Sequence, residues 1–84
     1  MVLLVAQNNL EISRFAVAAG RRVGNAVVRN RVKRRLRACV EEISSSVKHG
    51  WDLIIYARQP VLTSDFDAIR TAMKTLVCEA GLMD

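Results

Sequence analysis

The feature that most constrains this chain is a long amphipathic segment, residues 25–47, with apolar positions on one side and cations on the other. Successive residues of a helix lie about 100° apart, and this spacing gathers the apolar positions into one stripe. A helix with such a stripe has to pack against a hydrophobic core, and Asn25 is of a residue type that caps helix N-termini. The segment therefore predicts a helix whose core-facing stripe comprises Val28, Val32, Leu36, Cys39, Val40, Ile43 and Val47.

Shorter apolar segments predict three strands around this helix. Residues 1–6 and 14–19 are of strand length, and the turn-forming residues between them favour an antiparallel pair joined by a loop around residues 7–13. Residues 52–58 are rich in β-branched and aromatic side chains, as in a buried strand, and Pro60 is expected to end that strand.

A second helix is predicted in the last third of the chain. Thr63 or Ser64 is expected to cap it, since Asp67 follows Ser64 by three residues as in a capping box, and Gly81 is suited to stop it. The order ββαβα, without internal repeats or linkers, predicts a single α+β domain over residues 1–84. The apolar face of the second helix comprises Phe66, Ile69, Met73, Leu76, Val77 and Ala80.

The positive charge is concentrated in one part of the chain. The net charge is +5, the sequence pI is about 10.0, and no acidic residue lies between Glu11 and Glu41. Arginine dominates this stretch, and its planar guanidinium pairs bidentately with phosphate. Cations near a helix N-terminus oppose the helix dipole unless an anion is bound, so the pattern favours RNA over a solvated or membrane-bound face. The cations are Arg14, Arg21, Arg22, Arg29, Arg31, Lys33, Arg34, Arg35 and Arg37.

The sequence does not support other kinds of site. The single histidine, His49, has no Ser or Cys partner at a recognisable spacing, and the acidic residues are scattered. Cys39, Cys78 and the one histidine are too few Cys and His residues for a tetrahedral metal site, and there is no CxxC motif. We expect both cysteines to be reduced residues packed in the core. No apolar stretch approaches the roughly 20 residues of a membrane span, and no secretory signal is evident. We therefore expect a soluble, cytoplasmic protein.

The segment from Arg21 to Arg37 resembles the signature of the bacterial ribonuclease P protein family. The family's pattern is a basic pair, a glycine, a short spacer, Arg-Asn-Arg, Lys-Arg and a later arginine. The corresponding residues are Arg21-Arg22, Gly24, Arg29-Asn30-Arg31, Lys33-Arg34 and Arg37. The strand ending in Asp-Leu-Ile-Ile-Tyr-Ala-Arg-Gln-Pro and the last helix are also similar to the family's C-terminal half.

This resemblance implies a fold and a function. The fold would be an α+β sandwich of the ribosomal protein S5 domain 2-like type, with the helix over 25–47 in a left-handed βαβ crossover, against the usual right-handed rule. The chain would be the accessory protein subunit of ribonuclease P, an endoribonuclease and hydrolase that removes the 5′ leader from precursor tRNA.

In the family the partner RNA is the catalyst, with bound magnesium. The resemblance therefore implies no catalytic residue, metal ligand or protein-held cofactor in this chain. A cleft beside the sheet would hold the leader. The residues expected to bind RNA are Arg21, Arg22, Arg29, Asn30, Arg31, Lys33, Arg34, Arg35 and Arg37.

The sequence departs from the family in one respect. Family members have an N-terminal helix whose aromatic residues line the leader cleft, and these 84 residues have no counterpart of it. We expect the apolar surface left uncovered to be hidden by self-association, with exchange of strands through a free edge at residues 2–6.

Two other functions are compatible with the charge pattern. One is a general RNA-binding or ribosome-associated module without a processing role. The other is a DNA-binding protein, which the lack of a helix-turn-helix pattern disfavours.

Overall fold

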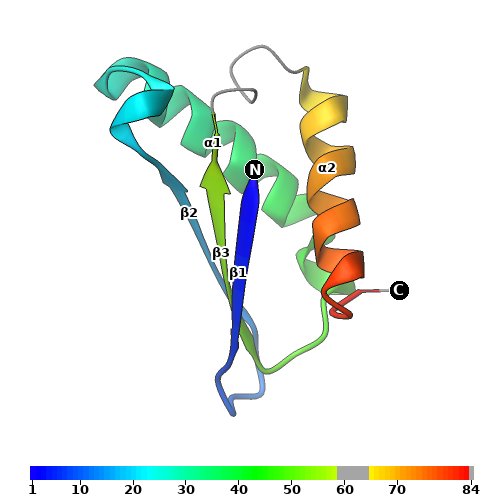
Figure 1. Cartoon of the computed structure of the whole chain (residues 1–84). Helices are drawn as coiled ribbons and strands as arrows, with labels where there is room; N and C mark the ends of the chain where they lie inside the picture. Colours follow the sequence, from blue (N-terminus) through cyan, green and yellow to red (C-terminus); the bar gives the residue numbers. More distant parts are fainter. Residues whose placement is uncertain (59–64, 84) are drawn as a thin grey trace.

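The computed structural model describes residues 1–58 and 65–83, and these form a three-stranded sheet with two helices packed on one of its faces (Figure 1). Two 3₁₀ turns, η1 (Arg21–Val23) and η2 (Ser44–Ser46), flank the first helix. The strands are β1 (Val2–Gln7), β2 (Arg14–Ala19) and β3 (Trp51–Ala57), and the helices are α1 (Ala26–Ile43) and α2 (Phe66–Glu79). The expected order ββαβα is confirmed.

The pairing of the strands differs from the sequence-based expectation. The sheet order is β1-β3-β2, so β1 and β2 are not neighbours, and the expected antiparallel pair between them is wrong. β3 lies between them, antiparallel to β1 and parallel to β2. The reason is that β3 is the strand most able to fill the core. Its alternate residues Leu53, Ile55 and Ala57 are buried, which favours the central position.

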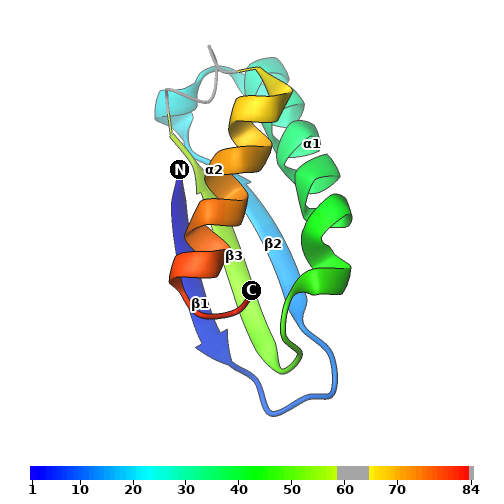
Figure 2. The same ribbon diagram turned by 90° about the vertical axis from the view of Figure 1, so that its right-hand side faces the viewer.

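The connection from β2 through α1 to β3 is left-handed. Figure 2 views the sheet from the side of the helices, with β2 and β3 both running upward. α1 crosses in front of the sheet, and β3 lies to the left of β2. A right-handed crossover would place β3 on the right. The crossover implied by the family resemblance is therefore present.

The ends of the helices follow the predicted chemistry with two corrections. Asn25 caps α1, because its side chain accepts a hydrogen bond of 3.0 Å from the Val28 N–H. α1 ends at Ile43, earlier than expected, and the serines continue it as η2. The cap of α2 is Asp65, which accepts from the Ala68 N–H at 2.7 Å, so the prediction of Thr63 or Ser64 is wrong. Those two residues, like Pro60, lie outside the described part of the chain.

The C-terminus of α2 ends in a Schellman motif. Gly81 adopts φ 78°, a left-handed conformation that glycine tolerates best. The Gly81 N–H donates to the Cys78 carbonyl at 3.0 Å, and the Leu82 N–H donates to the Val77 carbonyl at 3.2 Å. Leu82 is buried, so the motif also returns an apolar side chain to the core. The prediction of Gly81 as the stop is confirmed.

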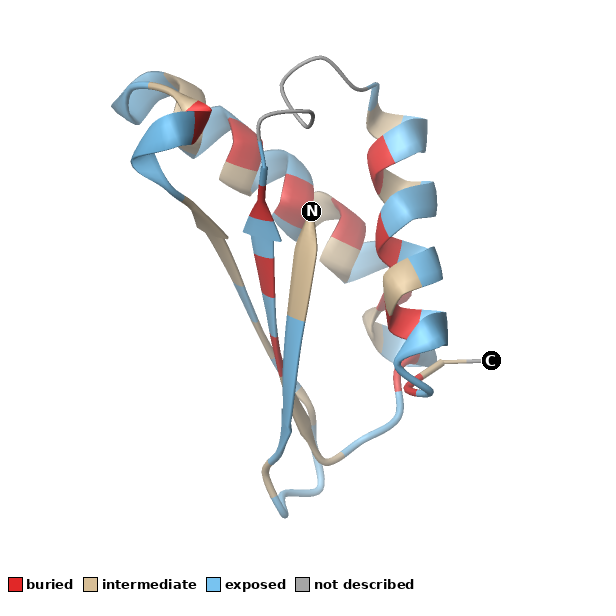
Figure 3. Cartoon of the chain, in the orientation of Figure 1, coloured by how far each residue is buried: buried red, intermediate tan, exposed pale blue. Residues whose placement is uncertain are grey.

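The core lies between the helices and one face of the sheet (Figure 3). The other face, here called the open face, is not covered by any described element. β3 is accordingly buried on one face alone, since Ile54 and Tyr56 are exposed, and the expectation of a buried strand is confirmed only for the face that carries Leu53, Ile55 and Ala57. The open face carries Val2, Leu4, Ala6, Arg14, Ala16, Ala18, Asp52, Ile54 and Tyr56, which the strand registers place side by side.

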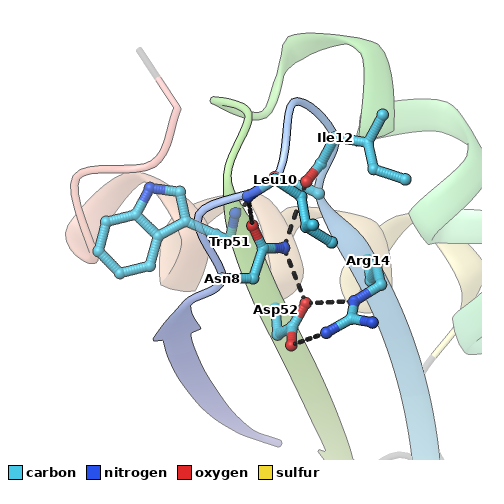
Figure 4. Close-up of polar contacts among 7 residues, drawn as sticks. Asn8, Leu10, Ile12, Arg14, Trp51 and Asp52 are labelled. Carbon is cyan, nitrogen blue, oxygen red and sulfur yellow. Dashed lines mark hydrogen bonds and ion pairs between the residues drawn. The ribbon is translucent and has the colours of Figure 1, made fainter.

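A polar cluster joins the three strands at one end of the open face (Figure 4). Asp52 on β3 accepts two hydrogen bonds from the Arg14 guanidinium on β2, at 2.8 and 2.7 Å. It also accepts one from the Asn8 amide, which follows β1, at 2.9 Å. These bonds, that of Arg14 foremost, lower the pKa of Asp52 from its ordinary 3.8 to about 2. The cluster links β2 and the residue that follows β1 to the central strand β3 at this end of the sheet.

The first prediction concerns this cluster. Because the folded-state pKa of Asp52 is depressed, its carboxylate stabilises the fold fully above pH 3.8, and the contribution is lost as the pH falls toward 2. Asp52→Asn should therefore lower the melting temperature slightly at pH 7, and the difference from the parent chain should disappear near pH 2. The effect is small because Arg14 and Asp52 are 60% and 35% exposed. Thermal melts between pH 2 and 7 test it; a pH-independent difference would contradict the role of the carboxylate charge.

Candidate nucleic-acid interface

The helix α1 separates apolar from cationic residues as the sequence predicts. Val32, Leu36, Cys39 and Ile43 are buried against the sheet and α2, Val28 and Val40 pack against them, and Val47 is buried beyond the helix end. The opposite side, here called the cationic face, is turned to solvent. It consists of Asn30, Arg31, Arg34, Arg35 and Arg37, which are exposed, and the half-buried Arg29 and Lys33.

The cations of this face are not neutralised within the described residues. The ion pairs there join Arg14 to Asp52 and Arg70 to Glu42 and Asp67, and none involves a cation of α1 or η1. The first turn of α1 carries no acidic residue, while its acidic pair Glu41-Glu42 lies near the C-terminal end. This distribution is the reverse of what the helix dipole favours, so a bound anion would remove an existing electrostatic cost.

The start of α1 is fixed by a glycine and a cap. Gly24 has φ 153°, and a Cβ there would lie 2.8 Å from Cγ1 of Val28, closer than carbon atoms approach. Val23 is buried directly before it and anchors η1. Asn25 then begins the helix. The glycine of the signature is therefore needed because the chain turns tightly against the first turn of α1, which sets where Arg21 and Arg22 lie.

A hollow of about 700 Å³ lies beside η1 at the end of the open face, opposite the polar cluster. Its apolar floor is made by Val2, Leu4 and Tyr56, from the adjacent strands β1 and β3. Its cationic lining is made by Arg21, Arg22 and Arg58. Arg21 and Arg22 thus line the hollow, and η1, which carries them, directly precedes α1 along the chain. Sequence reasoning missed Tyr56 and Arg58, although the alternation of β3 could have placed Tyr56 on the solvent side.

Several candidates prove not to belong to this region. Arg14 lies at the far end of the open face, paired with Asp52, and is not available as an unpaired cation. Cys39 is buried as expected, and burial raises the pKa of its thiol, but Cys78 is exposed, which contradicts the expectation that both pack in the core. Cys78 falls on the solvent side of α2 because Val77 takes the core position next to it. His49 is exposed in the turn before Gly50.

Two further observations concern the described part of the chain. It contains no cluster of three or more His, Cys, Asp or Glu side chains able to hold a metal ion. Neither of its helices combines the length and the apolar character that crossing a membrane requires.

The second prediction tests the division of α1 into two sides. Leu36→Ala removes a fully buried side chain and should cost ~2–5 kcal/mol of stability. Arg34→Ala should leave the melting temperature nearly unchanged and weaken RNA binding about tenfold or more, since a charge-assisted hydrogen bond contributes ~1.5 kcal/mol or more. Lys74→Ala, at an exposed position of α2, is the matched control and should change neither.

Circular dichroism melts and a binding titration with a structured RNA separate these outcomes. Equal losses of thermal stability in Leu36→Ala and Arg34→Ala would show that the two sides of α1 are assigned wrongly.

A family model and the relatives described below, which are similar in sequence to this chain, point to the same family. The model of the family described as Ribonuclease P matches residues 1–81. A ribonuclease P protein component from Syntrophomonas wolfei is 33% identical over 82 residues, which cover 98% of this chain and 69% of the relative. One from Symbiobacterium thermophilum is 42% identical over 71 residues, covering 84% of this chain and 62% of that protein. The chain thus spans roughly two thirds of the length of these relatives.

Solved structures show the same fold. The ribonuclease P protein of Staphylococcus aureus superposes with a TM-score of 0.83 at 24% identity, covering 98% of this chain and 75% of that one. The protein from Thermotoga maritima, in complex with a fluorophenyl thiourea, gives a TM-score of 0.80 at 25% identity and covers 89% and 74%. The α+β fold expected from the resemblance is confirmed, and the family match covers nearly the whole chain. The chain belongs to the ribonuclease P protein family, the protein components of the enzyme that processes precursor tRNA.

Proposed function

We propose that this chain acts in the cytoplasm by binding the catalytic RNA of ribonuclease P through its cationic face, and that it presents the 5′ leader of precursor tRNA on its open face. The observation that carries the proposal is the row of solvent-facing arginines on α1, none of which is paired within the described residues. The same face contains the Arg29-Asn30-Arg31 segment by which the sequence resembles the family.

The cationic face suits a folded RNA. Its side chains project from a rigid helix that is anchored by Leu36 and Cys39, both fully buried, so their spacing is fixed before binding. Arginine forks pair bidentately with phosphate oxygens, and Asn30 can donate to or accept from a base or a ribose. A double-stranded RNA is recognised mainly through its backbone and shape, which such a surface can follow.

The open face suits a single strand. Tyr56 is 41% exposed in the middle strand, and Leu4 and Ile54 lie next to it. Single-stranded RNA binds by stacking its bases on aromatic side chains while cations hold the phosphates. Tyr56 can supply the stacking surface, and Arg21, Arg22 and Arg58 around the hollow can hold phosphates. A leader bound there would lie beside η1, the turn that directly precedes α1.

On this proposal the chemistry of cleavage belongs to the partner RNA and its magnesium ions. The chain contributes binding and orientation. It lowers the concentration of magnesium needed by supplying cations where two RNAs approach each other, and it holds the leader so that the scissile phosphate lies at the catalytic centre.

A leader-cleavage assay with the cognate catalytic RNA tests this function. Adding the chain at limiting magnesium should accelerate removal of the leader. Tyr56→Ala should reduce the affinity for precursor tRNA about fivefold or more, because stacking one base contributes ~1–3 kcal/mol, and should leave binding of leaderless tRNA unchanged. Tyr56→Phe keeps the ring and is the control.

Two results would contradict the proposal. The absence of any acceleration by the parent chain would favour the general RNA-binding module. An equal loss for precursor and leaderless tRNA in Tyr56→Ala would show that the open face does not hold the leader.

A further inference from the structure

The outer edge of β1 is unprotected. β1 pairs with β3 on one side, and no described residue pairs with its other side. Its sequence, Val-Leu-Leu-Val-Ala-Gln, contains no charged residue, proline or glycine. Edge strands of soluble proteins usually carry such residues or are covered by another element, because the unpaired backbone groups of an exposed edge can bind a strand of another molecule.

The side chains of β1 are exposed on both faces of the sheet. Leu4, on the open face, is 51% exposed, and Val5, on the helix side, is 40% exposed. The helices therefore do not reach over the outer part of β1, and Figure 3 shows the strand exposed along most of its length. Burying these side chains together with the edge would remove apolar surface from water and pair free backbone groups.

The other edge of the sheet, formed by β2, is flanked by charged side chains and by a helix. β2 begins with Arg14, and α1 packs against the strand. A groove beside it is lined by Arg37 and Glu41, so charged side chains flank this edge. Pairing of β1 with β2 of another copy would also leave further edges free and grow into a filament, whereas pairing of β1 with itself closes after two copies.

We propose that β1 is a dimerisation edge, at which two copies of this chain pair antiparallel about a two-fold axis into a continuous six-stranded sheet. Opposed residues of an antiparallel pair must point to the same face, which restricts the register. Placing Leu4 opposite Leu4 also sets Leu3 opposite Val5 and Val2 opposite Ala6. Every apolar side chain between residues 2 and 6 then gains a cross-strand partner.

Charge favours this arrangement over stacking of the open faces. Each chain carries a net charge of +5, but β1 carries none, and α1 lies over the β2 side of the sheet, away from β1 (Figure 2). Two copies joined through β1 keep their cationic faces at opposite ends. In the antiparallel pair, the hollow end of β1 in one copy lies beside the opposite end of β1 in the other copy, the end that pairs with Asp52. The two basic hollows therefore do not face each other. Stacked open faces would instead desolvate Arg21, Arg22 and Arg58.

The helices of both copies lie on one side of such a sheet, and the two open faces form one platform on the other. The dimer thus leaves the two cationic faces clear of the seam, whereas each hollow borders it through Val2 and Leu4.

Charge substitutions at the two-fold position test the proposal by sedimentation velocity on the 84-residue chain. The parent chain should sediment as a species of twice 9.4 kDa at micromolar concentrations. Leu4→Lys and Leu4→Glu should each be monomeric, because two like charges would face each other across the strands. An equimolar mixture of the two variants should restore the dimer, since Lys then faces Glu. Ile54→Lys, the same change on the central strand of the same face, should remain dimeric.

Each of the opposite results overturns the proposal. A parent chain that stays monomeric at all concentrations excludes the dimer. Loss of the dimer in Ile54→Lys as complete as in Leu4→Lys indicates stacking of the open faces. A mixture that stays monomeric, when circular dichroism shows both variants to be folded, shows that Leu4 does not face itself. Leu4→Ala, which adds no charge, should remain dimeric and keeps the test decisive if a charged variant does not fold.

Discussion

The packing of the α1 stripe against the sheet is the interaction on which the rest of this structure depends. Leu36, Cys39 and Ile43 are almost fully buried, and they hold the helix in one rotational setting. A helix has a single axis, so fixing the apolar side also fixes the direction of every arginine on the opposite side. The position of the cations is therefore a consequence of core packing. Binding phosphate does not require the loss of conformational entropy that ordering a mobile basic tail would cost.

The same packing explains why the chain tolerates an unfavourable charge distribution. Cations at the N-terminal end and acids at the C-terminal end of α1 both oppose the helix dipole. An isolated helix with this pattern would be weakened, whereas here burial of the stripe compensates for the cost. The tight turn at Gly24 and the cap at Asn25 add local stability at the end where repulsion is greatest. One side of α1 thus contributes to the stability of the fold, and the opposite side provides the cations proposed to bind RNA.

The sequence predicted correctly those features that depend on a few neighbouring residues, such as helix faces and helix ends. The stripe of α1, the Asn25 cap and the Gly81 stop follow from spacing and residue type, and all three are present. The strand order could not be derived in this way. Whether residues 1–6 pair with 14–19 or with 52–58 depends on which strand fills the centre of the core, and each segment alone is compatible with both. For the same reason the exposure of Tyr56, and with it the hollow, became visible only once the uncovered side of the sheet was known.

The dependence of RNA affinity on salt tests the central claim most directly, because it counts the phosphates that the cationic face neutralises. If about five of its cations contact phosphate, the logarithm of the association constant should fall with the logarithm of salt concentration with a slope of about −4 or steeper. Replacing one contacting arginine should reduce the slope by roughly one. A slope near zero, or one unchanged by removing arginines from α1, would contradict the account.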